Sequence, residues 1–255
     1  LSFSILTDPD QAVYIVGYTE SRDFPPSRAV LPRKDAFITK LASDGKTLVY
    51  TAFFPVDYGL EPPLGAAVDA KGSVVLAGGT ADYRFPVKNA FQKDYGGGRS
   101  DGFVLKLAPS GKSLAFSSFL GASGDDACAR VGLDAAGSIY VGGTTTSRDF
   151  PVKNAFQKML KGNSRDLFVS KFSADGRSLL YSTYLGGDAT DNLFGMAVDG
   201  GGAAYLAGGT SSRNFPLKNA IQARLGGASD AFVLKLAPKG RSLVYSSVLG
   251  GPQSD

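Results

Sequence analysis

The sequence predicts an all-β fold, a β-propeller of four four-stranded antiparallel blades. Three markers recur with a common period, and each repeat unit contains four short strand patterns. The motif Asp-(Ala/Gly/Leu)-Phe begins at Asp35, Asp101, Asp166 and Asp230, so its copies lie 66, 65 and 64 residues apart. A Phe-Pro pair begins at Phe24, Phe85, Phe150 and Phe215, and an Asp that opens a tight turn stands at Asp8, Asp69, Asp134 and Asp199. A sustained period of about 65 residues is typical of a repeat architecture.

The fourth copy shows why each unit is expected to be a blade. Glycine-containing turns at 199–202 and 237–240 separate apolar runs, and glycine permits the positive φ that such turns need. The second run has no polar face, so both of its faces should be covered, as in a blade packed between two others. Strands are expected at 195–198, 203–208, 230–236 and 242–249, with a long connector over 211–229.

The period also sets the domain organisation. We expect one propeller domain over residues 1–255, with blades of approximately 1–58, 59–123, 124–188 and 189–255. The four blades either close into a ring or form part of a larger one, completed by further sequence or by a second chain. An unclosed set would expose one apolar face at each end, which favours self-association.

Several of these motifs resemble a known family. The runs at 101–111, 149–151, 181–187 and 197–199 are similar to the bacterial SBBP β-propeller repeat, and the first two strands of each unit are also similar to NHL-type repeats. The first copy departs from the pattern, because Pro26-Ser27-Arg28-Ala29 replaces the Val-Lys-Asn-Ala of later copies. The resemblance implies a secreted or cell-surface bacterial protein, with its export signal outside these residues, and so indicates a location more than an activity.

Composition removes several classes of chemistry. The chain has no histidine and one cysteine, Cys128, which excludes a histidine general base, histidine-ligated metals and an internal disulfide. We expect Cys128 to be buried and inert. The net charge of +4 is mild, and basic and acidic residues are interspersed along the chain, which does not favour nucleic-acid binding. No apolar run is long enough to span a membrane.

Strand alternation places the four long connectors on one face, and binding residues often collect on such loops. That face is therefore the predicted ligand or partner site. We interpret the repeated Phe-Pro-(Val/Leu)-Lys-Asn-Ala segments within the connectors as structural, and the lysines of the third strands as solvated. The basic residues that the connectors contribute are Arg22, Arg84, Arg148, Arg213, Lys88, Lys153 and Lys218.

A repeated acid precedes the turn Asp of copies two to four by eight residues, and Asp255 occupies the corresponding position for a further copy. These acids give a weaker prediction. A ring of carboxylates around the axis could coordinate calcium, which takes six to eight oxygen ligands. Capping of turns or pairing with arginine explains the same repetition more simply. No other cofactor is expected. The calcium candidates are Glu61, Asp126, Asp191 and Asp255.

The leading functional hypothesis is a non-catalytic interaction or structural propeller that binds a protein or a glycan through the connector face. One alternative is a polysaccharide-acting glycosidase or lyase, because paired carboxylates cleave glycosides without histidine. A second alternative is a calcium-stabilised scaffold. Strict repetition weakens the enzyme hypothesis, since an active site usually gives one copy unique residues.

Overall fold

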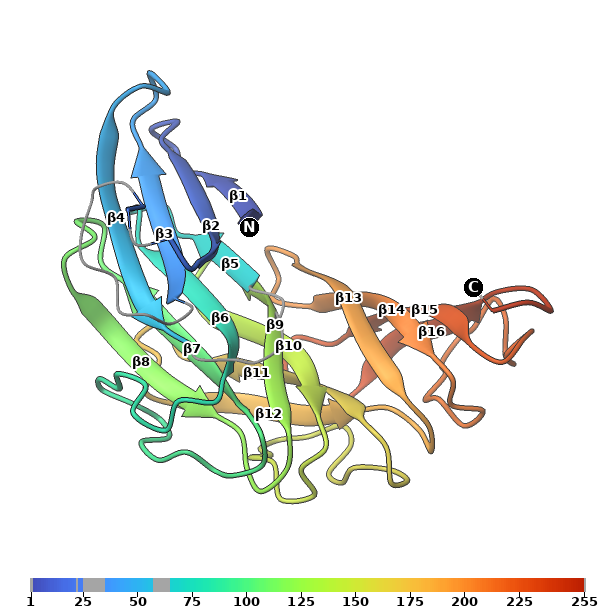
Figure 1. Cartoon of the computed structure of the whole chain (residues 1–255). Helices are drawn as coiled ribbons and strands as arrows, with labels where there is room; N and C mark the ends of the chain where they lie inside the picture. The colour runs from blue at the N-terminus through green and yellow to red at the C-terminus, as the bar shows by residue number, and fades with distance from the viewer. Residues whose placement is uncertain (1, 22, 25–34, 57–64, 255) are drawn as a thin grey trace.

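The computed structural model describes residues 2–21, 23–24, 35–56 and 65–254, and strands are the only regular elements among them. The strands form four antiparallel sheets, each built from four consecutive strands (Figure 1). The first sheet holds β1 (Ser2–Thr7), β2 (Val13–Thr19), β3 (Asp35–Leu41) and β4 (Leu48–Pro55), and the second holds β5 (Gly65–Val68), β6 (Val74–Thr80), β7 (Asp101–Leu107) and β8 (Leu114–Leu120). The third holds β9 (Asp126–Leu133), β10 (Ile139–Thr145), β11 (Asp166–Phe172) and β12 (Leu179–Leu185), and the fourth holds β13 (Asp191–Val198), β14 (Ala204–Thr210), β15 (Asp230–Leu236) and β16 (Leu243–Leu249).

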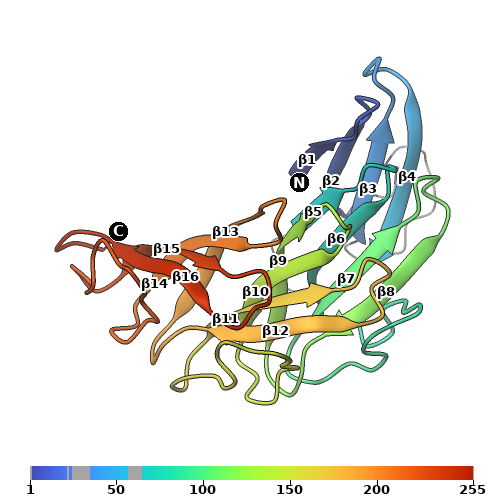
Figure 2. The ribbon, with the colours of Figure 1, turned by 180° about the vertical axis from the view of Figure 1, so that it is seen from behind.

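The four sheets, called blades 1 to 4 below, follow one another along an arc, with blade 1 at one end and blade 4 at the other (Figures 1 and 2). The first strand of each blade contacts the first strand of the next. Each sheet pairs only its own strands within the described residues, so hydrogen bonds do not close the arc. The all-β blade architecture predicted from the sequence is confirmed.

The apolar core lies between blades and divides into three clusters, one at each blade boundary. Every residue of β6 is buried, as expected for a strand covered on both faces. In β14, at the end of the arc, buried and exposed positions are mixed. The difference follows from position, because a neighbouring blade covers β6 from each side.

The strand that opens blade 4 begins earlier than the sequence indicated. A start at Gly195 was expected, whereas β13 begins at Asp191. The pairing of β13 with β14 shifts register between Leu193 and Gly195. This irregularity interrupts the alternation of apolar residues, and so hides the first half of the strand from a pattern search.

The long connectors of blades 2, 3 and 4 fold back along the outermost strand of their own blade. In blade 3, Lys153 pairs with Ser182 and Gln157 pairs with Tyr184 of β12. Phe150 lies with its ring centroid 4.4 Å from that of Phe168. The structural interpretation of these segments is thus confirmed for blades 2, 3 and 4, where the connector covers an edge that would otherwise offer unpaired backbone groups. An asparagine at the tip of each described connector adopts a left-handed φ of 48 to 49°, at Asn89, Asn154 and Asn219.

No helix among the described residues is long and apolar enough to cross a membrane.

Candidate functional site

Charged clusters repeat at the turn between the first and second strands of each blade. In blade 3, Asp134 accepts hydrogen bonds from Lys171 Nζ at 2.9 Å and from the Tyr140 hydroxyl at 3.1 Å. Burial raises the pKa of Asp134, but the hydrogen bonds from Lys171 and from the Ser138 backbone outweigh it, and the net shift is downward. The third-strand lysines, interpreted as solvated, are instead paired with acids of their own blade. The four pairs are Asp8 with Lys40, Asp69 with Lys106, Asp134 with Lys171, and Asp199 with Lys235.

The connector arginines differ from one another in their contacts, although the sequence makes them look equivalent. Arg84 donates from Nε to Asp82 at 3.2 Å and lies over the Tyr83 ring, and its side chain is 68% exposed. Arg148 donates to the carbonyl of Gly162 and to the side chain of Asn163, within its own connector. Arg213 is exposed, and Arg22 lies outside the described residues.

The connector lysines do not lie beside these arginines. Lys88 and Lys153 are exposed at positions where the connector backbone pairs with the middle of β8 and β12, and Lys218 occupies the same position on β16. Lys218 also donates from Nζ to the carbonyl of Leu243. The basic residues predicted on one connector face are therefore divided between the loop ends of the blades and their outer edges.

The acids considered as calcium ligands lie in buried pairs. A Cβ added at Gly121 would meet oxygens of both Asp101 and Asp126, at 2.5 Å and 3.0 Å, so these carboxylates flank one glycine. Asp126 accepts hydrogen bonds from the Ala122 backbone and the Ser147 hydroxyl, both at 2.7 Å. The Oδ1 atoms of Asp101 and Asp126 are both buried without a hydrogen-bond partner. Glu61 and Asp255 lie outside the described residues.

The same pairing recurs at the next boundary, where Asp166 and Asp191 flank Gly186. Asp191 accepts hydrogen bonds from the Gly187 backbone and the Ser212 hydroxyl, at 2.9 Å and 3.0 Å. Burial raises the pKa of Asp166 to about 7 and also raises that of Asp191. Both carboxyls are fully buried, and hydrogen bonds from neighbouring backbone and side-chain groups hold Asp191 there. No group of three or more Cys, Asp or Glu side chains within the described ranges could hold a metal ion.

Cys128 is buried, as expected. Burial and the nearby Asp126 and Asp101 carboxylates raise the pKa of its thiol well above the usual range. A thiol that stays protonated is a poor nucleophile. Cys128 therefore packs as a small apolar side chain.

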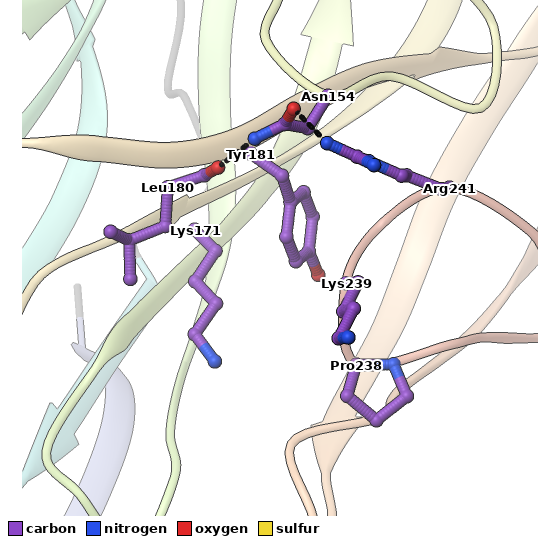
Figure 3. Close-up of a pocket in the computed structure, with 7 residues that line it drawn as sticks. All are labelled: Asn154, Lys171, Leu180, Tyr181, Pro238, Lys239 and Arg241. Atoms are coloured by element: carbon purple, nitrogen blue, oxygen red, sulfur yellow. Dashed lines mark hydrogen bonds between the residues drawn. The ribbon is translucent and has the colours of Figure 1, made fainter.

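A surface recess with a basic lining lies between blades 3 and 4, and we call it the basic groove (Figure 3). Its cavity of about 330 Å³ lies between β12 and the turn that joins β15 to β16. Arg241 of that turn donates to Asn154 at the connector tip of blade 3, and Asn154 in turn donates to the carbonyl of Leu180 at 3.0 Å. The full lining is Asn154, Lys171, Leu180, Tyr181, Pro238, Lys239 and Arg241.

The charge of the basic groove is uneven. Lys171 is neutralised by Asp134, whereas Lys239 and Arg241 are exposed and no described acid pairs with either. Tyr181 is only 1% exposed, because its ring packs against Gly240, so it offers little surface to a ligand. A recess with two exposed cations suits a ligand that carries an acidic group.

Sequence reasoning missed the basic groove. One available signal is the basic residue that follows the glycine of the second turn of each blade, which joins its third and fourth strands. These residues are Lys46, Lys112, Arg177 and Arg241. The wall of the groove that Asn154 forms could not be anticipated. Asn154 reaches Arg241 only because its connector folds back and because blades 3 and 4 pack at a particular angle.

Comparisons with known proteins inform the fold more than the site. No family model matches the chain, and no curated protein matches it. A crystal structure of a protein of unknown function from Dyadobacter fermentans superposes with a TM-score of 0.53 at 15% identity, covering 98% of this chain and 69% of that one. An X-ray structure of a candidate gluconolactonase aligns with 79% of this chain and 53% of its own at 16% identity, with a TM-score of 0.33. The first similarity supports the fold alone, and the second is too low to transfer fold or activity.

Proposed function

We propose that this chain is a non-catalytic interaction propeller of an exported bacterial protein, and that it binds a protein or glycan partner carrying acidic groups. The observation that carries the proposal is the basic groove between blades 3 and 4. There, Lys239 and Arg241 stay exposed, whereas the repeated lysines of the third strands are paired with acids of their own blades.

Neighbouring side chains support this placement. Lys153 is exposed one residue before Asn154, on the connector that forms one wall of the groove. Arg177 lines a similar recess at the boundary of blades 2 and 3, so basic residues continue along the outer edge of the arc. A row of exposed cations on a rigid scaffold favours a partner with several carboxylate or sulfate groups, because such contacts add together.

The enzyme alternative has less support. Its best residues would be Asp101 and Asp126, which burial brings to pKa values of about 7 and about 6. A glycosidase needs both carboxyls in contact with the substrate. Asp101 and Asp126 are 0% and 1% exposed, so neither can contact a polysaccharide in this structure. The raised pKa values belong to the interior of the blade boundary.

The export and family parts of the proposal rest on the repeat motifs. The similarity of 101–111 and 181–187 to the SBBP repeat favours a secreted or cell-surface bacterial protein. Secretion can be checked by locating the protein in culture supernatant, surface and cell fractions of the source organism.

Binding can be tested with an array of neutral, carboxylated and sulfated glycans and a matched set of acidic and neutral peptides. We expect acid-selective binding that weakens with salt and is lost in the double variant Lys239→Ala/Arg241→Ala. Lys46→Ala/Lys71→Ala, at exposed turn lysines of blades 1 and 2, removes the same number of charges and is the control. Loss in Arg148→Ala and Arg213→Ala with the groove variant unaffected would move the site to the connector arginines. Equal loss in Lys46→Ala/Lys71→Ala would refute a defined site.

A further inference from the structure

One aromatic contact repeats at every blade boundary. An aromatic residue in the fourth strand of one blade packs its ring flat against a glycine of the next blade. That glycine lies in the second turn, which joins the third and fourth strands. A Cβ on that glycine would lie 2.4 Å from the ring at each boundary, so glycine is required there. The three contacts join Tyr50 to Gly111, Phe116 to Gly176, and Tyr181 to Gly240.

A hydrogen bond repeats beside it at two of these boundaries. The Tyr140 hydroxyl shares its proton between Asp134 of its own blade, at 3.1 Å, and the carbonyl of Gly202 in the first turn of the next blade, at 2.8 Å. Tyr14 makes the same link to the carbonyl of Gly72, at 3.3 Å. Both acceptor residues have a left-handed φ, of 82° and 79°.

The two ends of the arc carry the unmatched halves of both contacts. Tyr245 of β16 holds the aromatic position, but no described blade follows it. Gly45 holds the glycine position in blade 1, and a Cβ there would have nothing within 4 Å. Likewise Tyr205 bonds only to Asp199 and Lys235 of its own blade among the described residues.

The acceptor half of the second contact is also present in blade 1. Gln11 takes the place of Gly72 in the first turn and has the same left-handed backbone, with a φ of 62°. Its carbonyl is therefore placed to accept a tyrosine hydroxyl, as the carbonyls of Gly72 and Gly202 do. Blade 1 thus presents the surface that blades 2, 3 and 4 each present to the blade before them.

The apolar residues around these contacts show the same pattern. Leu249 of blade 4 is 43% exposed, whereas its equivalent Leu185 in blade 3 is fully buried under blade 4. At the other end, Leu48 of blade 1 is 37% exposed, whereas its equivalent Leu243 in blade 4 is 3% exposed. The free face of blade 4 therefore matches the buried face of blade 3, and the free face of blade 1 matches the buried face of blade 4.

We propose that the free face of blade 4 binds blade 1 of a second copy of this chain. In that contact the Tyr245 ring packs on Gly45 of the partner copy, and the Tyr205 hydroxyl donates to the carbonyl of Gln11. The two halves do not meet within the described part of one chain, since a Cβ on Gly45 would have nothing within 4 Å. A head-to-tail contact of this kind closes when two copies use it twice, and it extends into longer chains when the rotation does not close.

Light scattering coupled to size exclusion, over a wide range of concentration, tests the proposal on the chain as it is. We expect a concentration-dependent dimer. The variant Gly45→Asn keeps a residue that tolerates the left-handed backbone but adds a side chain where the ring must pack. The variant Tyr245→Ala removes the ring. Each is expected to weaken association by ~30-fold or more, as for loss of a central aromatic anchor.

Mixing the two variants gives a sharper test. Gly45→Asn retains Tyr245, and Tyr245→Ala retains Gly45, so the mixture can form one intact contact although neither variant can alone. Recovery of dimer only in the mixture supports the proposal. Tyr83→Ala, which removes a 71% exposed aromatic from a connector, is the control and should associate like the wild type. A monomer at every concentration, or association unchanged by both variants, would overturn the proposal.

Discussion

Replacing Asp101 by asparagine should flatten the pH dependence of stability near neutrality. Burial is the main cause that raises the pKa of Asp101 from 3.8 to about 7, and the neighbouring Asp126 charge adds to it. The native state therefore binds this proton more tightly than the unfolded chain does. Its contribution to stability is fully present below about pH 4 and is lost as the pH rises through about 7.

The size of the effect follows from the same pKa values. A change from 3.8 to about 7 corresponds to roughly 4 kcal/mol above pH 7, since one pKa unit is worth about 1.4 kcal/mol. For a chain of this length, each kcal/mol shifts the melting temperature by about 2–4 °C. The wild type should thus lose ~10 °C between pH 4.5 and 7.5 because of Asp101 alone. The paired Asp8, Asp69 and Asp134 have lowered pKa values, so they act below this window.

The assay is urea unfolding at several pH values, followed by far-ultraviolet circular dichroism. Asp101→Asn should show a fall in the free energy of unfolding with pH that is smaller than that of the wild type by the share of Asp101, roughly 4 kcal/mol, and should be more stable than the wild type at pH 7.5. Asp126 and Asp166 also have raised pKa values, so a residual fall remains in the variant. Asp94→Asn, at an exposed position, is the control and should follow the wild type. Equal slopes for Asp101→Asn and the wild type, or a wild type that gains stability between pH 4.5 and 7.5, would refute the reasoning.

Three further predictions concern the contacts between blades and the buried acids. Gly240→Ala should destabilise the chain by at least ~2 kcal/mol in thermal unfolding, because the added methyl would lie 2.4 Å from an aromatic ring. Gly45→Ala should cost only the ~1 kcal/mol that a left-handed backbone costs a residue other than glycine. Tyr140→Phe should cost about 1–2 kcal/mol, and Tyr205→Phe less, because only the first also bonds to the next blade; equal costs would contradict this reading. Calcium should leave the melting temperature unchanged, since one oxygen of Asp126 already accepts hydrogen bonds from a backbone amide and a serine hydroxyl. A rise in melting temperature with calcium that Asp126→Asn abolishes would instead establish the calcium-stabilised alternative.

The repeat period predicted the blades because turn glycines and apolar runs are local features. Gly202 and Gly240 both have the left-handed φ that the sequence required of their turns. The cross-strand partners could not be read in the same way. Lys171 appeared to be solvated because its partner Asp134 lies in the turn between β9 and β10, and only the register of β10 with β11 brings them together.

The site was harder to predict than the fold for a related reason. The connectors were expected to crowd one face, but Asn154 lies where its connector has folded back along β12. Nothing in the local sequence sets that direction, since it depends on pairing with a strand that comes later in the chain. The basic groove then depends on how blade 4 packs against blade 3, which no single repeat contains.

The ring-on-glycine contact also bears on how such a chain can grow. Each repeat carries an aromatic residue for the blade after it and a glycine for the blade before it, so a duplicated unit brings both parts with it. A gain or loss of one whole repeat would leave every remaining boundary with its usual pair, and evolution could change the copy number without altering any interior side chain. Such a chain is stabilised through nearest neighbours, and in the monomer its end blades, each with one neighbour, are expected to exchange their amide hydrogens first.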